Sequence, residues 1–326
     1  MLFYFSSRII ALNNIEFILQ NNENQLIMNP LFGIDLGGTK IEGVVLASKT
    51  DPSVIARLRV PTESAKGYQH IIEQIAKVVA ALEKEVNASA PHVGIGVPGT
   101  HDPITNLHKN ANTTCLNGQP FKQDLAKKLG IEVRMANDAN CFAAAEANIG
   151  AVKDHFPNGA ESVFGVIMGT GVGGGLVVNG QVLNGRQGIG GEWGHNFLHE
   201  SGGNCYCGKI GCVETIIAGP SLERFYKSLT GNALKLNEIF TRLETDDAAR
   251  QTKARLIHFF GKGMGSIINM IDPDAIVIGG GVGNISALYT EGVEEVKKNI
   301  FNGRLDTVFL KPKLGDSAGV FGAALL

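Results

Sequence analysis

Hydrophobic and polar positions follow two different periods along the chain. Short apolar runs, several of them flanked by glycine, predict β-strands at 31–34, 41–47, 54–60, 93–97, 133–135, 162–168, 176–178, 275–278 and 308–310. Apolar or small residues at helical spacing predict helices at 68–86, 123–129, 137–148, 247–271, 285–300 and 318–326. Because strands and helices interleave, the expected fold class is α/β.

One pattern occurs twice. A strand, a glycine turn and a second strand follow one another near residue 35 and again near residue 170. Each unit begins a half of the chain that contains further strands and helices. The chain has 326 residues, enough for about two domains. We therefore expect two similar domains.

Composition and charge narrow the class of protein. The 29 basic and 31 acidic residues nearly cancel, which argues against a protein devoted to nucleic acid or to an anionic membrane surface. No apolar run reaches the ~18 residues of a membrane span. Three of the five cysteines lie within eight positions, which favours metal binding in a reducing compartment over a disulfide framework. We expect a cytoplasmic protein with no nucleic acid and no membrane as partner.

Residues 1–27 differ from the rest of the chain. They open apolar and aromatic (MLFYF) and become asparagine-rich (NNENQ). A basic start followed by a small-residue cleavage site, as in a signal peptide, is missing. We expect a poorly ordered extension, with a secreted protein as the alternative.

Three glycine clusters follow predicted strands and are candidate phosphate-binding loops. Glycine lets backbone N–H groups approach a phosphate, and threonine adds a hydroxyl donor. A nucleotide could lie among all three, although each could also be a tight hairpin turn. The Walker A and Rossmann motifs both fail, because Thr39-Lys40 stands where Lys-Ser/Thr is required and because a strand follows Gly174. The clusters are Gly37-Gly38-Thr39, Gly169–Gly175 and Gly279-Gly280-Gly281.

Carboxylates at strand ends are the candidate catalytic groups. Asp35 leaves the first strand beside a glycine loop, where an acid suits Mg²⁺ near phosphate or stabilises its own turn. Asp138 lies in Asn137-Asp138-Ala139-Asn140, at a strand-to-helix junction that serves as a site or as a helix cap. Glu192 and His195, separated by two residues and flanked by glycine, suit hydrogen bonds to hydroxyl groups.

A histidine and three cysteines have the spacing of a metal site. His195, Cys205, Cys207 and Cys212 supply one imidazole and three thiols. That set closes a tetrahedral, structural zinc site with no open position for water. A disulfide is the alternative and would leave one thiol over. Glu214 follows two residues after the last cysteine and could reach the same neighbourhood.

Taken together, these motifs resemble the ROK family of sugar kinases and repressors. The resemblance covers nearly everything from Met28 to Leu326 and rests on the segments 33–40, 96–99, 137–140, 169–175, 191–195, 205–214 and 272–274. It implies an actin-like ATPase fold, in which two ribonuclease-H-like α/β domains flank a cleft. The implied domains are 28–137 with 315–326, and 138–314 with a zinc-binding loop.

The resemblance also assigns roles to residues. Asp138 would be the catalytic base, and His195 would both bind zinc and contact the sugar. The sugar would lie near Asn137, Asp138, Glu192, His195 and Glu214. ATP and Mg²⁺ would lie on Asp35, Gly37, Gly38, Thr39, Lys40, Gly169, Thr170, Gly171, Gly173, Gly280 and Gly281.

The implied activity is transfer of the γ-phosphoryl group of ATP to the 6-hydroxyl of a hexose. Within the family, the segments 109–112 and 116–121 look most like bacterial fructokinase, so D-fructose is the expected sugar. N-acetylglucosamine kinase and glucokinase are the alternatives. A repressor or a non-catalytic sugar sensor is the alternative class, and the family suggests a homodimer.

Overall fold

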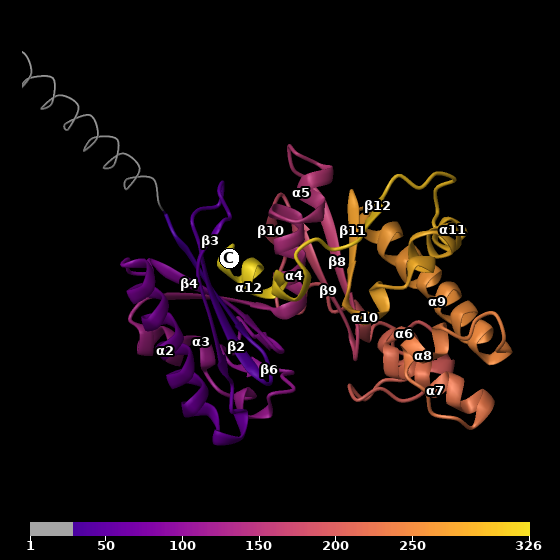
Figure 1. Cartoon of the computed structure of the whole chain (residues 1–326), viewed down its shortest axis with the longest axis horizontal. Helices are drawn as coiled ribbons and strands as arrows, with labels where there is room; N and C mark the ends of the chain where they lie inside the picture. Colours follow the sequence, from indigo (N-terminus) through magenta and orange to yellow (C-terminus); the bar gives the residue numbers. More distant parts are fainter. Residues whose placement is uncertain (1–28) are drawn as a thin grey trace, which may run out of the picture.

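The computed structural model describes residues 29–326, so the predicted extension at 1–27 lies outside the described residues. Two five-stranded sheets form the framework (Figure 1). The first has the order β3-β2-β1-β4-β7, with β1 Leu31–Leu36, β2 Lys40–Leu46, β3 Val54–Pro61, β4 His92–Val97 and β7 Glu132–Asn137. The second has the order β10-β9-β8-β11-β12, with β8 Ser162–Met168, β9 Val172–Val178, β10 Gln181–Val182, β11 Ala275–Gly279 and β12 Val308–Leu310.

The two sheets have the same topology. In each, the first three strands along the chain pair antiparallel, and the fourth and fifth add parallel strands on the other side of the first. The two strand–glycine turn–strand units are β1–β2 and β8–β9. The expectations of an α/β fold and of two similar halves are therefore confirmed.

Helices cover the faces of both sheets. They are α2 Tyr68–Val86, α3 Phe121–Leu129, α4 Asp138–Asn148, α5 Ala151–His155, α6 Glu214–Ile217, α7 Gly219–Thr230, α8 Leu236–Phe240, α9 Asp247–Ile271, α10 Gly280–Gly283, α11 Glu291–Lys297 and α12 Ala318–Ala324. A small hairpin, β5 Thr100–His101 with β6 His108–Lys109, follows β4. Short 3₁₀ turns lie at Ser64–Lys66, Thr114–Leu116, Trp193–His195, Glu200–Gly202, Ser286–Tyr289 and Gly315–Ser317.

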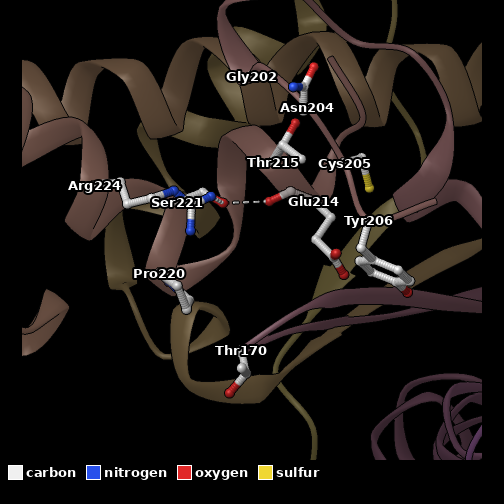
Figure 2. A pocket seen from close by; sticks show the side chains of 10 residues that line it. All are labelled: Thr170, Gly202, Asn204, Cys205, Tyr206, Glu214, Thr215, Pro220, Ser221 and Arg224. Carbon is white, nitrogen blue, oxygen red and sulfur yellow. Dashed lines mark hydrogen bonds between the residues drawn. The ribbon is translucent and has the colours of Figure 1, made fainter. Parts of the chain in front are cut away.

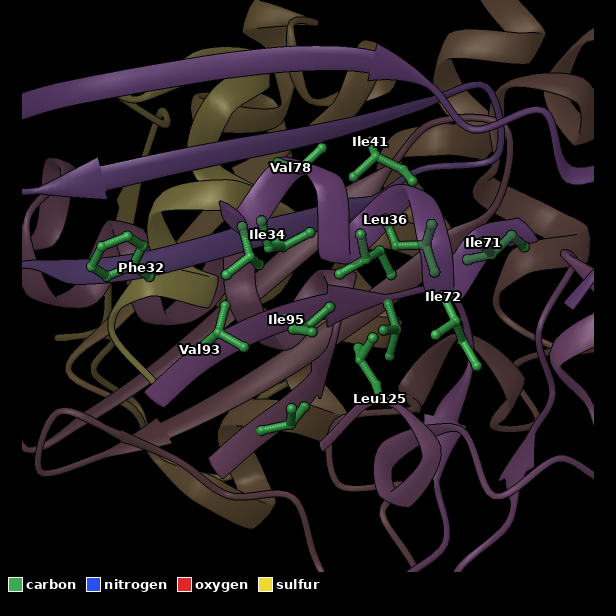
Figure 3. Close-up of a cluster of buried hydrophobic side chains, with 14 of the residues drawn as sticks. Phe32, Ile34, Leu36, Ile41, Ile71, Ile72, Val78, Val93, Ile95 and Leu125 are labelled. Atoms are coloured by element: carbon green, nitrogen blue, oxygen red, sulfur yellow. The ribbon is translucent and has the colours of Figure 1, made fainter. Parts of the chain in front are cut away.

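The core of the first half lies between its sheet and α2. Side chains of β1 and β4, such as Ile34 and Ile95, meet Ile71 and Ile72 of α2, and Leu125 of α3 closes the cluster (Figure 3). These residues are fully or almost fully buried. The helical spacing predicted over 68–86 thus becomes the face of α2 that packs on the sheet.

Two helices, α4 and α12, fill the space between the sheets (Figure 1). α12 packs on the first sheet and α4 on the second, and the two helices pack on each other. Small residues allow this approach: a Cβ on Gly94 would lie 1.8 Å from the Ala323 carbonyl oxygen, and one on Gly322 would lie 1.7 Å from that of Cys141. The C-terminal helix therefore returns to the first sheet, as the resemblance implied.

Some predicted elements were wrong. The single helix expected at 285–300 is a 3₁₀ turn at Ser286–Tyr289 and then α11, because the backbone of Thr290 (φ −120°, ψ −86°) is not helical. The region 214–246 contains α6, α7 and α8, which no predicted element covered. No helix within residues 29–326 is long and apolar enough to cross a membrane.

Candidate active site

A cavity of about 1320 Å³ opens between the two halves of the molecule. The first half contributes residues after β4 and at the end of β7, among them Gly99, Asn110, Asn112 and Asn137. The second half contributes the turn after β8, the 189–196 loop, and Ile267, Met270 and Ile271 near the end of α9. A site with walls from two lobes can change its shape when the lobes move, as kinase sites do.

Asp138 lies in this cavity at the first turn of α4. Asn137 caps the helix, since its Oδ1 accepts a 2.8 Å hydrogen bond from the Ala139 amide, and its Nδ2 donates to the Gly99 carbonyl at 3.2 Å. Asp138 Oδ1 also accepts from the Ala139 amide, at 2.8 Å. The carboxylate is open to the cavity, yet the protein around it displaces enough water to raise its pKa. Asn137 is therefore the helix cap, and the adjacent Asp138 lines the cavity.

Asp35 is the second-last residue of β1 and lies near Asp138 at the start of α4, but it does not line the cavity. Its carboxylate lies against Gly319 of α12, where a Cβ would be 3.4 Å from Oδ1. Burial, together with the negative charges of Asp138 and Glu42, raises the pKa of Asp35 to about 6. The charge of Asp138 therefore disfavours the ionised form of Asp35, and carboxylate oxygens are the ligands that a hard divalent cation such as Mg²⁺ prefers.

The glycine clusters differ in whether they line the cavity. Gly169, Thr170, Gly171 and Gly173 line it, whereas Gly280 and Gly281 do not. β11 runs parallel to β8, and a Cβ on Gly280 would lie 2.3 Å from the Met168 carbonyl oxygen. The second and third clusters therefore lie side by side at the C-terminal ends of β8 and β11, two neighbouring strands of the second sheet.

The first cluster forms the turn between β1 and β2. Gly37, Gly38, Thr39 and Lys40 do not line the cavity. The ammonium of Lys40 instead pairs with the buried carboxylate of Glu42 at 3.2 Å. In this arrangement Lys40 is engaged by a residue of its own strand.

Glu192 and His195 come from a loop that lies along β9. Gly194 has no room for a side chain, because a Cβ there would lie 1.9 Å from the Val172 carbonyl oxygen. The Trp193 indole donates to the Gly173 carbonyl at 3.2 Å. Burial raises the pKa of Glu192, and the neighbouring Asp138 and Glu214 add to the rise while His195 opposes it. The loop thus brings a second carboxylate, after Asp138, to the cavity.

Glu214 begins α6 and points back to the glycine turn after β8. Its Oε2 accepts a 3.0 Å hydrogen bond from the Val172 amide. Asp138, Glu192, His195 and Glu214 therefore line the same cavity, as the sequence predicted.

The predicted metal ligands also come together. Donor atoms of His195, Cys205, Cys207 and Cys212 all lie within 4.8 Å of one another. Cys205 Sγ lies 3.6 Å from His195 Nδ1, and Cys207 Sγ lies 3.6 Å from Cys212 Sγ. Ligands at tetrahedral corners about 2.3 Å from a zinc ion are separated by about 3.8 Å, so the four residues fit that metal.

Tyr206 also lines the cavity, and the sequence analysis did not single it out. Its hydroxyl lies 2.9 Å from His195 Nε2, the ring nitrogen turned away from the cysteines. The expected contact between that nitrogen and the sugar therefore competes with Tyr206. Its place between Cys205 and Cys207 was the available signal, because a residue between two predicted metal ligands must lie close to the predicted metal site.

A smaller hollow of about 490 Å³ adjoins the cavity (Figure 2). Thr170, Tyr206 and Glu214 border both. Its far side is α7, where the Arg224 guanidinium donates to the Ser221 hydroxyl at 2.9 Å. This hollow extends the space on the side of the glycine turn that faces α7.

Comparison with known proteins assigns the class. The sequence profile of the ROK family matches residues 31–326, and the chain belongs to that family. An N-acetyl-D-glucosamine kinase from Mannheimia succiniciproducens is 35% identical over 91% of this chain and 98% of its own length. One from Pasteurella multocida is 34% identical over 90% and 98%.

A solved structure agrees with the fold. The ROK hexokinase from Thermus thermophilus superposes with a TM-score of 0.81 at 30% identity, covering 91% of this chain and 97% of that one. The actin-like ATPase fold expected from the sequence is confirmed. The chain is a ROK sugar kinase.

Proposed function

We propose that this protein is an ATP-dependent N-acetyl-D-glucosamine kinase that phosphorylates the 6-hydroxyl of the sugar. The similarity to N-acetyl-D-glucosamine kinases along nearly their whole length carries this choice of sugar. It favours the alternative over D-fructose, the first expectation. Glucose stays the second candidate, because the structural relative is a hexokinase.

Asp138 is the proposed catalytic base. Its carboxylate lines the cavity, and its raised pKa brings it closer to the basicity that proton transfer near neutral pH requires. It would orient the 6-hydroxyl and accept its proton as the phosphoryl group arrives. Glu192 and Glu214 offer acceptors for other sugar hydroxyls, and Asn137 holds the Gly99 turn in place beside them.

The nucleotide would lie along the glycine clusters. Phosphoryl transfer depends on positioning and on charge neutralisation. Gly169, Thr170, Gly171 and Gly173 line the cavity, so the Thr170 hydroxyl and backbone N–H groups of this turn are the proposed donors; the Gly169 N–H already donates to the Gly171 carbonyl at 2.9 Å. Gly280–Gly281 already lie beside the 169–175 turn in the second half, and closure of the lobes would bring the turn at 37–40 to the same phosphates. Mg²⁺, when bound near Asp35, supplies positive charge to the phosphate oxygens.

Zinc is proposed as a structural ion held by His195, Cys205, Cys207 and Cys212. Four protein ligands leave no open position, so the metal stabilises the loop rather than the transition state. Tyr206 then fixes the orientation of the imidazole through Nε2, as partners of metal-bound histidines do.

Several sequence-based expectations remain proposals. The domain boundaries 28–137 with 315–326 and 138–314 are supported by the packing of α12 on the first sheet. The homodimer, the cytoplasmic location and the absence of a nucleic acid partner rest on the sequence alone.

ADP release in the presence of Mg-ATP tests the function. The panel is N-acetyl-D-glucosamine, N-acetylmannosamine, glucose, mannose and fructose. We expect kcat/KM for N-acetyl-D-glucosamine to exceed the others at least tenfold, a difference of about 1.4 kcal/mol. A preference for glucose or fructose would keep the mechanism and change the substrate. A folded protein that binds sugar without releasing ADP would be a sensor.

A further inference from the structure

Residues 195–212, here called the metal loop, carry the four predicted ligands and Tyr206. Within the described chain, the hydrogen bonds of residues 197–211 stay inside this loop, with one exception. The exception is a pair of bonds that Arg255 of α9 donates to Ser201. Between its two ends, the loop is therefore attached to the rest of the protein by hydrogen bonds from a single side chain.

Arg255 is held in one orientation by Ser201 and by two aromatic rings. Its Nη2 donates to the Ser201 hydroxyl at 2.9 Å and to the Ser201 carbonyl at 3.3 Å. Its guanidinium carbon lies 4.7 Å from the centre of the Phe225 ring of α7 and 4.9 Å from that of Phe259 of α9. A planar cation between two aromatic faces has little freedom, so the donors point in one direction.

No carboxylate within residues 29–326 forms an ion pair with Arg255. The aromatic faces and Ser201 are its partners instead. His199 reinforces the contact, because its ring packs 5.2 Å from the Phe259 ring and its Nδ1 lies 2.9 Å from the Ser201 hydroxyl. The turn at residues 199–201, here called the clamped turn, is therefore held in a defined position against α7 and α9.

The clamped turn lies in the chain between two metal ligands. Ser201 follows His195 by six positions and precedes Cys205 by four. His195 is within hydrogen-bond distance of the Tyr206 hydroxyl, and Cys205 immediately precedes Tyr206 in the chain. Both His195 and Tyr206 line the cavity. A shift of the turn would move His195 and Tyr206 relative to the sugar, even with all four ligands in place.

We propose that Arg255 is a positioning residue, a second anchor of the metal loop that acts independently of the metal. The metal fixes the inner geometry of the loop, and Arg255 fixes the loop against α7 and α9. The expected effect of Arg255 on sugar binding rests on the proposed function. Its expected effect on the position of the metal loop does not depend on that function.

Hydrogen exchange of the purified, metal-loaded protein tests the anchor without any substrate. In Arg255→Met, amides 201–205 and Gly211 should exchange faster than in the wild type while metal content is unchanged. Lys253→Met, which removes a cation from the same helix, is the matched control and should leave loop exchange unchanged. Ser201→Ala, a milder change, should raise exchange in the same segment to a smaller extent and serves if Arg255→Met does not fold.

Kinetics then test the consequence. Arg255→Met should raise KM for N-acetyl-D-glucosamine about tenfold and leave KM for ATP within about twofold, and Arg255→Lys should recover part of the loss. Trp193, the single tryptophan, lies two residues before His195, so its fluorescence reports sugar binding separately from turnover. Unchanged loop exchange, or loss of metal together with Arg255, would overturn the proposal. A wild-type protein without activity on this sugar would refute the proposed function and leave the exchange test intact.

Discussion

Glu214 and Val172 connect the metal loop to the glycine turn. Oε2 of Glu214, two residues after the ligand Cys212, accepts a 3.0 Å hydrogen bond from the amide of Val172. Gly171 allows this contact, because a Cβ there would lie 2.5 Å from the same oxygen. One carboxylate thus touches both the proposed phosphate-binding turn and the sugar side of the cavity.

A methyl group at position 171 should disturb that contact. Gly171→Ala should displace the end of the flexible Glu214 side chain and break its hydrogen bond to the Val172 amide, so we expect it to destabilise the protein by about 0.5–1.5 kcal/mol, the usual net contribution of one hydrogen bond. Glu214→Ala removes the clashing carboxylate, so Gly171→Ala should cost clearly less in that background. Thermal unfolding of the wild type, both single variants and the double variant forms the cycle that measures this coupling. Additive costs would show that the two residues do not contact each other in solution.

Asp138→Asn should separate catalysis from binding. We expect kcat to fall roughly 10²–10⁴-fold, the usual contribution of a general base, with little change in sugar affinity measured by Trp193 fluorescence. Asn140→Asp and Asn148→Asp on the same helix are not suitable controls, because Asn140 is buried and the half-buried Asn148 donates a hydrogen bond to the Gly180 carbonyl. Asp154→Asn, on the surface of α5, is the better control and should keep its turnover. Near-normal turnover of Asp138→Asn would remove Asp138 from the mechanism.

The raised pKa of Asp138 also predicts a pH effect on stability. The folded protein binds the proton of this carboxyl more tightly than the unfolded chain does, so stability falls as pH rises through and above the ordinary aspartate range. Asp138→Asn cannot ionise and should therefore melt at a higher temperature than the wild type at pH 7.5. The difference should shrink as pH falls toward 4. A variant that melts lower at both pH values would contradict this assignment.

Local patterns predicted the parts of the molecule that depend on near neighbours. The repeated strand–turn–strand units and the cluster of four predicted metal ligands could be predicted because each lies within a short segment. α7 was missed because Gly219-Pro220 looks like a turn, although proline in the first helical turn favours a helix start. The engagement of Lys40 by Glu42 and of His195 Nε2 by Tyr206 depends on tertiary placement, which spacing along the chain does not contain.

Glu146 should be important for stability without touching the cavity. Its side chain is fully buried on α4 and accepts hydrogen bonds from the amides of Ala151, Lys313 and Leu314 at 2.8–3.1 Å. Those amides include the segment that leads from β12 to α12. Glu146→Gln would turn an NH₂ group toward N–H donors, and we expect a loss of roughly 2–4 kcal/mol in the free energy of unfolding.

Denaturant unfolding measures that loss. Glu161→Gln, at the surface before β8, is the control and should stay within about 0.5 kcal/mol of the wild type. A Glu146→Gln protein as stable as the wild type would mean that the 311–314 segment is not held by this carboxylate.

Cys207→Ser tests the metal separately from Arg255. Cys207 is the most exposed of the three cysteine ligands, so its replacement disturbs packing least. We expect the purified variant to contain much less zinc and to have a higher KM for the sugar, because three remaining ligands hold the loop less firmly. Cys115→Ser, a cysteine of the first half outside the cluster, should keep both zinc and affinity. A variant free of metal that binds sugar as tightly as the wild type would show that the loop is positioned without the ion, and Arg255 would then be its principal anchor.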